Sequence, residues 1–203
     1  MVERVRGGRR NTRAEILDAS VDLFGSRGFG ATSLDDIAGR VGVAKQTLLY
    51  WFPSKDELLD AVLGQTALEL ATTIEAAVRA APDEPLARIE AVVKAVFRPA
   101  VRRPALLGLV REVSRLSPTH AERLTLQVQP FVRRATEYLG EQMAAGRLRQ
   151  ADPGLVIALA YATVVGVATE PEALRAVEWA ATPSGLRRLR AEMIDFLLAA
   201  LKP

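Results

Sequence analysis

Few residues in this sequence have the types needed for covalent or metal chemistry. The chain contains no cysteine, which excludes disulfides, thiolate catalysis and cysteine-ligated zinc. Its single histidine, His120, removes most multi-histidine metal sites and argues against a serine–histidine hydrolase. The sequence shows no nucleophile–base pair, no acidic cluster and no glycine loop of the dinucleotide-binding type. We therefore expect a protein that binds rather than catalyses, without a metal or another cofactor.

Positive charge is concentrated at the N-terminus. Residues 1–13 carry five arginines against Glu3, for a net charge of +4. Residues 14–60 carry four basic residues against eight acidic ones, for a net charge of −4. A short arginine-rich segment is typical of contacts with nucleic-acid phosphates. We expect residues 1–10 to form a flexible basic arm that contacts DNA when DNA is bound.

The longest uncharged run, at residues 153–169, has a length at the lower limit for a membrane span. It contains a proline, two glycines and a tyrosine, and we interpret it as a buried helix. The arginine-rich first ten residues lack the apolar stretch of a secretory signal. The sequence therefore predicts a cytoplasmic protein without membrane contact.

Helical periodicity runs through the whole chain. Alanine and leucine are abundant and aromatic residues make up 5% of the sequence, which favours packed helices over sheets. Apolar residues recur at intervals of three and four in successive segments. We predict an all-α fold of about nine helices, at 11–28, 34–41, 44–51, 54–81, 86–101, 104–116, 118–145, 153–169 and 184–201.

Residues 34–53 fit a helix-turn-helix. Two short helices that cross over a tight turn need apolar residues at fixed positions, a small residue where they meet and glycine in the turn. Ala38 supplies the small side chain, and Gly42 lies where a left-handed conformation would cost another residue about 1 kcal/mol or more. The apolar positions are Ile37, Val41, Val43, Leu48 and Trp51. An ordinary helical hairpin that binds nothing is the alternative.

The sequence around this motif resembles the tetracycline-repressor (TetR) family. The resemblance covers residues 12–63 and includes RAEILDASVDLFGSRGF, ATSLDDIA and VGVAKQTLLYWFPSKDELL. It implies a repressor dimer with a three-helix DNA-binding head at 11–54 and a body at 55–203 that binds a small effector and dimerises. Beyond residue 63 the resemblance rests on the number and length of the helices and on GRLRQADP at 146–153.

The family pattern assigns the reading of DNA sequence to the start of the third helix. It places Lys45, Gln46 and Thr47 there, and these side chains suit guanine, adenine and the thymine methyl group in the major groove. A solvated helix face is the alternative. The chain departs from the family at Ala44, where serine is common, and at Leu49, where tyrosine is common. Leu49 either makes an apolar base contact or leaves one phosphate anchor missing.

Phosphate contacts are expected on both sides of the third helix. The resemblance implies that Tyr50 and Lys55 contact phosphates. Thr32 and Ser33 precede the second helix, where hydroxyl groups and backbone amides can hold a phosphate. Trp51 fits the core better than the DNA surface.

The C-terminal half offers a surface for a second copy of the chain. The last predicted helix has a coiled-coil-like seam at Leu186, Leu189, Met193, Phe196 or Leu197, and Ala200. The preceding apolar helix has small residues four apart at Ala158, Ala162 and Gly166. Two such helices from each chain would form a four-helix bundle about a two-fold axis. Packing of both helices on the chain's own core is the alternative.

An effector pocket is expected among the middle helices. Polar candidates on apolar faces are Thr66, Thr73, Glu112, Gln127, Gln129 and Tyr138, and wall candidates are Phe97, Leu109, Val113 and Phe131. Because no acidic cluster indicates a polycation, a mostly apolar small molecule is favoured. The predicted function is a repressor that leaves a palindromic double-stranded DNA operator when this effector binds. An all-helical ligand- or lipid-binding module, or an enzyme, without DNA binding is the alternative.

Overall fold

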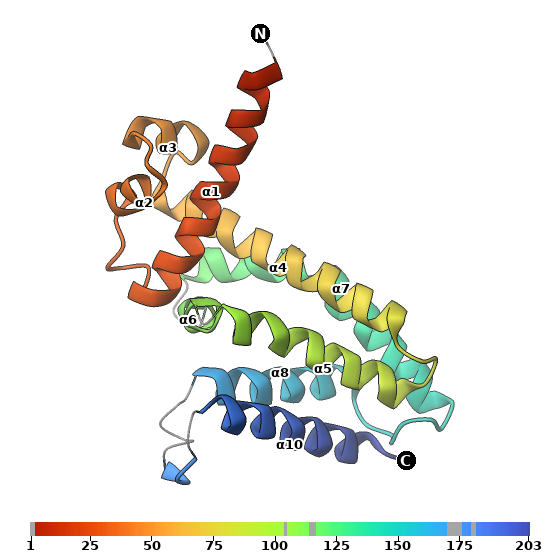
Figure 1. Ribbon diagram of the computed structural model, residues 1–203. Coiled ribbons are helices and arrows are strands. Elements are labelled where there is room, and N and C mark those ends of the chain that lie inside the picture. Colours follow the sequence, from red (N-terminus) through yellow and green to blue (C-terminus); the bar gives the residue numbers. More distant parts are fainter. Residues whose placement is uncertain (1–2, 104, 114–116, 170–175, 180–181) are drawn as a thin grey trace. The chain divides into compact units, whose positions relative to one another are not determined.

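The computed structural model describes residues 3–103, 105–113, 117–169, 176–179 and 182–203. Within these ranges the regular secondary structure is helical, without strands, which confirms the predicted all-α fold (Figure 1). The helices are α1 (Glu3–Arg27), α2 (Leu34–Val41), α3 (Lys45–Trp51), α4 (Lys55–Ala80), α5 (Pro85–Arg102), α6 (Ala105–Val113), α7 (Pro118–Ala144), α8 (Pro153–Thr169) and α10 (Pro183–Leu201). The predicted bounds agree to within two residues, apart from the start of α1 and the end of the segment 104–116, whose last three residues lie outside the described ranges.

Helix α1 begins at Glu3, well before the predicted start at Asn11. The apolar periodicity begins only at Ile16, so it did not predict that the helix extends back to Glu3. Arginine and glutamate are good helix formers, and extending an existing helix needs no new nucleation. Gly7 and Gly8 each cost about 1 kcal/mol relative to alanine, which makes this the weakest part of α1. The arm's contact with DNA remains a prediction.

The chain divides into two compact units that interleave in the sequence. The first combines Met1–Leu68 with Arg103–Gln127, and the second combines Glu69–Arg102 with Val128–Pro203. The first unit therefore contains α1, α2, α3 and α6 together with the N-terminal parts of α4 and α7. The second contains α5, α8 and α10 with the remainders of α4 and α7. A segment from the middle of the chain thus completes the N-terminal unit.

A continuous apolar core holds the first unit together. It contains Ile16, Leu17 and Phe24 of α1, Ile37 of α2, Leu48 of α3, Leu58, Leu59 and Val62 of α4, and Leu109 of α6, each 2% exposed or less. Burial of a side chain of this size contributes about 1.5–3 kcal/mol. Because every helix of the unit contributes, α2 and α3 are held against a rigid support.

Helices α1 and α6 cross at a pair of glycines. A Cβ atom at Gly108 would lie 1.7 Å from the carbonyl oxygen of Gly25. A Cβ atom at Gly25 would lie 1.9 Å from the carbonyl oxygen of Ala105. Only glycine at both positions lets the two backbones approach this closely. Figure 1 shows α6 beside the C-terminal end of α1.

In the second unit, α10 packs against α5 and α8. The buried side chains are Val93 of α5 and Met193, Ile194 and Leu197 of α10, with Phe97, Ala160, Val164 and Leu198 partly buried around them. Met193 and Leu197, which were predicted to lie in a dimer seam, therefore face the chain's own core. Phe196, the other candidate for that seam, is 64% exposed. Leu186, another seam position, has its side chain outside the described residues.

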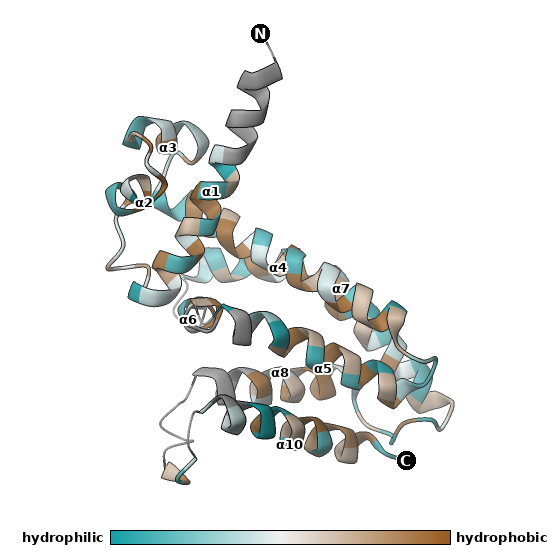
Figure 2. Ribbon diagram, in the orientation of Figure 1, coloured by the Kyte–Doolittle hydropathy of each residue, from teal (hydrophilic) through white to brown (hydrophobic). Residues whose placement is uncertain are grey.

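Helix α8 has one half-buried face and one exposed face. Ala160 and Val164 contact the α5–α10 cluster, whereas Leu155 and Leu159 are 62% and 67% exposed. Figure 2 shows apolar residues along α8 and along much of α10. Across the described ranges, no helix combines the length and apolar character needed to cross a membrane. The helix predicted at 153–169 is thus present, but its described side chains are half-buried or exposed rather than buried.

Candidate nucleic-acid interface

The turn between α2 and α3 has the predicted geometry. Gly42 has φ of 79°, in the left-handed region where a residue with a Cβ atom is strained. The N–H groups of Gly42 and Val43 both donate to the carbonyl oxygen of Ala38, at 2.9 and 3.0 Å. Ala38 itself is buried, as its predicted place between the helices requires. The chain therefore turns within three residues, and α3 begins at Lys45.

Helix α3 has one anchored face and one exposed face. Leu48 is fully buried, and Trp51 packs against the same core, as predicted. The exposed residues are Lys45, Gln46, Thr47 and Tyr50. Leu49 is half-buried between these two faces. A helix whose exposed first turn carries an ammonium, an amide and a hydroxyl group can contact base edges in the major groove.

Lys45 forms an ion pair with a residue of α2. Its Nζ atom lies 2.7 Å from Oδ2 of Asp35, and both side chains are largely exposed. An exposed pair of this kind contributes at most about 1 kcal/mol to stability. It does keep the ammonium group of Lys45 next to the first turn of α2. The pair joins α2 to α3, and helical periodicity does not predict pairs between two helices.

Lys55 begins α4 and lies against an aromatic ring. Its Nζ atom is 4.2 Å from the centroid of the Phe29 ring, a cation–π contact that contributes about 0.5–2 kcal/mol. Ser54 precedes it and caps the helix, since its Oγ accepts from the N–H of Glu57 at 3.1 Å. The position of Lys55 is therefore fixed by both its backbone and its side chain.

Thr32 has an internal role in place of the predicted phosphate contact. Its side chain is 1% exposed, and its hydroxyl donates to the carbonyl oxygens of Gly28 at 2.9 Å and Leu23 at 3.3 Å. A buried hydroxyl with these partners cannot reach a phosphate on a DNA surface. The prediction for Thr32 is therefore corrected: it closes the loop between α1 and α2.

Ser33 is the N-cap of α2 and forms a capping box with Asp36. Its Oγ accepts from the N–H of Asp36 at 3.1 Å, and the Asp36 carboxylate accepts from the N–H of Ser33 at 2.8 Å. The hydrogen bond from the Ser33 side chain, followed by that from its backbone, holds the pKa of Asp36 below its usual value. An ionised carboxylate thus lies at the end of α2 where a phosphate was predicted.

Arg103, which precedes α6, is a residue that the sequence analysis missed. Its Nε donates to Oδ1 of Asp22 at 2.8 Å. Its two terminal nitrogens donate to Oδ1 of Asp18 at 2.7 Å and to the carbonyl oxygen of Asp18 at 2.6 Å. The guanidinium group therefore joins the start of α6 to two successive turns of α1. The helical pattern had placed both aspartates on the solvent side.

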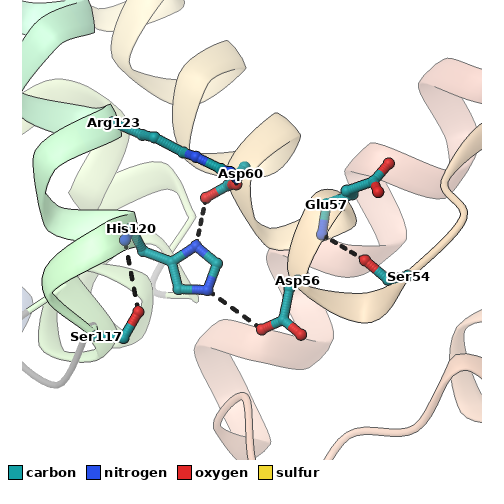
Figure 3. A network of polar contacts seen from close by, with 7 residues as sticks. All are labelled: Ser54, Asp56, Glu57, Asp60, Ser117, His120 and Arg123. Atoms are coloured by element: carbon teal, nitrogen blue, oxygen red, sulfur yellow. Dashed lines mark hydrogen bonds and ion pairs between the residues drawn. The ribbon is translucent and has the colours of Figure 1, made fainter.

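His120 joins α7 to the first two turns of α4 (Figure 3). Its Nδ1 lies 2.5 Å from Oδ1 of Asp60, and its Nε2 lies 3.2 Å from Oδ1 of Asp56. The hydrogen bond to Asp60 raises the pKa of His120 above its ordinary value, and burial, which opposes the charge, does not cancel this. Arg123 also donates to Asp60. In the described parts of the chain, no group of three acidic or histidine side chains is placed to hold a metal ion.

The residues predicted to line an effector pocket fall in both units. The first unit contains Thr66, Leu109, Glu112, Val113 and Gln127, and the second contains Thr73, Phe97, Phe131 and Tyr138. Leu109 is part of the core of the first unit, and Phe97 packs in the α5–α10 cluster. The side chain of Val113 lies outside the described residues. Their contact with a ligand remains a prediction.

Three of the polar pocket candidates, Thr73, Glu112 and Tyr138, have partners within their own unit. The hydroxyl of Thr73 donates to the carbonyl oxygen of Glu69 at 2.8 Å. The carboxylate of Glu112 accepts from the backbone N–H of Phe29 at 2.9 Å. The ring of Tyr138 lies 5.6 Å from the guanidinium carbon of Arg88. The contact between Glu112 and the loop before α2 was not visible in the sequence, because it spans 83 positions.

Comparison with known proteins identifies the helix-turn-helix unit. Residues 16–62 match the family model described as bacterial regulatory proteins, tetR family. That segment begins at the first buried residue of α1 and includes the left-handed turn at Gly42. Residues 16–62 therefore form a DNA-binding segment of the TetR type. The resemblance that the sequence motifs indicated is thereby confirmed.

Among TetR-family relatives, the transcriptional regulator RutR of Escherichia coli K12 is 52% identical over 50 residues. This match covers 25% of the present chain and 24% of RutR. The transcriptional regulator EthR of Mycolicibacterium smegmatis is 27% identical over 170 residues, which cover 80% of this chain and 76% of EthR. Both relatives are named as transcriptional regulators. The chain thus matches about a quarter of the length of RutR at high identity and most of EthR at lower identity.

The TetR fold extends over nearly the whole chain. The regulator FadR from Bacillus subtilis, solved in complex with stearoyl-CoA, superposes with a TM-score of 0.79. The superposition covers 92% of this chain and 98% of FadR, at 15% sequence identity. At that identity the similarity establishes the fold alone. The helices that follow the DNA-binding segment therefore have a TetR-type arrangement.

Proposed function

We propose that the protein is a cytoplasmic, sequence-specific DNA-binding repressor of transcription. As a homodimer it binds a palindromic operator in double-stranded DNA, and a small, mostly apolar effector releases it. The observation that carries the proposal is the exposed first turn of α3 on a TetR-family helix-turn-helix. An anchored helix with an exposed polar end is what insertion into the major groove requires.

The proposed contacts divide into base-reading and phosphate-binding residues. Lys45, Gln46 and Thr47 read base edges, and Leu49 makes an apolar contact beside them. Tyr50 and Lys55 bind phosphates and so set the orientation of α3. Ser33 contributes less than the sequence predicted, because its side chain and its N–H are bonded to Asp36.

The proposed dimer rests on the apolar surface of α8 and α10. Leu155 and Leu159 of α8 and Phe196 of α10 are each more than 60% exposed. Ala158 and Ala162 lie on the same face of α8 as the two leucines and are also exposed, so a second helix can approach closely there. Exposed apolar side chains of this size, gathered on two packed helices, are typical of a protein interface. A two-fold dimer would also supply the two heads that a palindrome needs.

The proposed effector is a mostly apolar molecule that binds in the body. The related FadR of Bacillus subtilis was solved with stearoyl-CoA, a long acyl chain joined to a nucleotide. For the present chain we use this only to choose ligands for a test. Acyl-CoA thioesters of increasing chain length, with free coenzyme A as the control, should show whether release from DNA depends on the apolar part.

Selection of tightly bound duplexes from a random pool, followed by affinity measurements on the selected site, tests the central proposal. We expect a palindrome whose half-sites lie about one helical turn, ~34–36 Å, apart or a multiple of that. Gln46→Ala should relax preference at one position of each half-site, at a cost of roughly 1–3 kcal/mol. Lys55→Ala should weaken all sequences alike and reduce the salt dependence by about one unit per head. Failure to enrich any sequence would refute sequence-specific binding.

Light scattering at micromolar concentration tests the dimer. The unsubstituted protein should have twice the mass of the chain, and Leu159→Glu should shift it towards the monomer because a charge cannot be buried unpaired in an apolar interface. Glu122→Ala on α7 provides a control on an exposed position outside this surface. A monomeric unsubstituted protein would contradict the proposed dimer.

A further inference from the structure

A carboxylate on α6 holds the loop between α1 and α2. Oε2 of Glu112 accepts from the backbone N–H of Phe29 at 2.9 Å. The carboxylate also lies close to the preceding residue, since a Cβ atom at Gly28 would be 3.6 Å from Oε1 of Glu112. Gly28 has φ of 88°, so the loop turns sharply at this contact. Glu112 thus fixes the backbone of Phe29 just where the chain leaves α1.

The side chain of Phe29 in turn supports the proposed phosphate anchor. Its ring centroid lies 4.2 Å from Nζ of Lys55. The same ring also lies beside Phe24, a fully buried core residue whose ring centroid is 5.4 Å away. A continuous set of contacts therefore leads from Glu112 through Phe29 to Lys55, all within the first unit.

Fixing a lysine before it meets DNA improves its contact with a phosphate. A free lysine side chain populates many rotamers, and part of this rotamer entropy is lost when the ammonium group binds. The ring face covers one side of the ammonium group of Lys55. The N–H donors of Lys55 that point away from the ring can bind phosphate oxygens. If Phe29 moves, Lys55 loses this support while keeping its charge.

We propose that Glu112 is a positioning residue for DNA binding, which holds Phe29 so that its ring presents Lys55 to a phosphate. This role rests on the proposed function and adds to it a residue that lies on α6, outside the helix-turn-helix. Because Glu112 acts through Lys55, its contribution to DNA affinity depends on the presence of Lys55. A purely structural role would instead affect DNA binding whether or not Lys55 is there.

A double-mutant cycle on the selected operator tests this dependence. Glu112→Ala should weaken binding roughly three- to tenfold, within the range that coupled residues outside a site usually show. In the Lys55→Ala background, the same substitution should change the dissociation constant by less than about twofold, which is the usual limit of additivity. Equal effects in both backgrounds would overturn the positioning role.

Three matched variants separate geometry from charge and folding. Glu112→Gln keeps an oxygen acceptor for the Phe29 N–H and should retain most of the affinity. Glu122→Ala removes the same charge from an exposed position of α7 and should leave affinity unchanged. Phe29→Leu keeps the hydrogen bond from the backbone N–H to Glu112 and removes the aromatic ring. It should therefore show the same loss of DNA affinity as Glu112→Ala, and it provides the test if Glu112→Ala folds poorly. Full affinity in Phe29→Leu would also overturn the proposal.

The same measurements keep this inference apart from the proposed function. If the unsubstituted protein binds no duplex, sequence-specific DNA binding itself is refuted. If it binds its operator and the effects of Glu112→Ala and Lys55→Ala are additive, DNA binding stands and the positioning role alone is wrong.

Discussion

Replacement of Gly108 by alanine tests the close crossing of α1 and α6. The added Cβ atom would lie 1.7 Å from the carbonyl oxygen of Gly25, whereas ordinary contacts of this kind begin at 3.4 Å. The backbones would have to separate by more than 1 Å, and a gap of 0.5–1 Å already forfeits a quarter to a half of a dispersion contact. Overpacking of a core typically costs about 1–3 kcal/mol. We expect a loss at or above the upper end of that range.

Two other glycines provide controls for the same substitution. Gly39 lies within α2, and a Cβ atom there meets nothing within 4 Å, so Gly39→Ala should stabilise the unit by about 0.5–1 kcal/mol. Gly42 also has open space but φ of 79°, so Gly42→Ala should cost about 1–2 kcal/mol through backbone strain alone. The three substitutions add the same methyl group and differ in the space around it and in the backbone conformation that the residue must adopt.

Urea unfolding followed by tryptophan fluorescence measures these changes in the correct unit. The chain has two tryptophans, and Trp51 packs against the core of the first unit. In a Trp179→Phe background the fluorescence therefore reports on the first unit alone. An unchanged urea midpoint for Gly108→Ala, or an equal loss for Gly39→Ala, would refute the close crossing.

Three further predictions concern charged groups. The hydrogen bond to Asp60 raises the pKa of His120, so the folded protein binds more protons than the unfolded chain above about pH 6.5. The contribution of His120 to the free energy of unfolding should therefore be complete below that pH. It should fall by at most about 1.4 kcal/mol per pH unit as the pH rises through the raised pKa. His120→Gln should remove this slope, and because the chain has one histidine, its imidazole NMR signals give the pKa directly. Arg103→Ala should destabilise the first unit by roughly 1–3 kcal/mol in urea, and Arg103→Lys should recover only part, since an ammonium group cannot form the same fork of bonds to Asp18 and Asp22. Deletion of residues 2–10 should weaken binding to specific and non-specific DNA alike and reduce its salt dependence, and an unchanged affinity and salt slope would contradict a DNA contact by the arm.

The features that were predicted correctly depend on neighbours in the sequence. The left-handed turn at Gly42 and the small residue at Ala38 each involve residues a few positions apart. Hydrogen-bonding rules within one helix turn are enough to place them. The exposed first turn of α3 followed in the same way, because burying Leu48 directs the neighbouring positions outwards.

The features that were missed join segments far apart in the chain. Arg103 meets α1 across more than 80 positions, and His120 meets Asp60 across 60 positions. Helical periodicity predicts that a charged residue lies on an outer face, but it does not predict which other helix lies there. The same holds for Thr32 over a shorter distance in the sequence. Its hydroxyl binds the carbonyl oxygens of Leu23 and Gly28, which come close to it only when the loop is folded.

The interleaving of the two units sets the order in which the DNA-binding part can be built. Its core needs Leu109 of α6, and its compact unit extends to Gln127, although α1, α2 and α3 lie within the first 51 residues. At about 5–20 residues per second, a ribosome needs roughly 3–12 s to pass from Leu68 to Gln127. During that time the apolar side chains of the first unit that later pack against α6 are exposed to solvent and to chaperones. A DNA-binding fragment that ends near Leu68 would keep those side chains exposed permanently. A soluble minimal fragment must therefore also contain residues 103–127, joined to the first 68 residues by a linker that replaces residues 69–102.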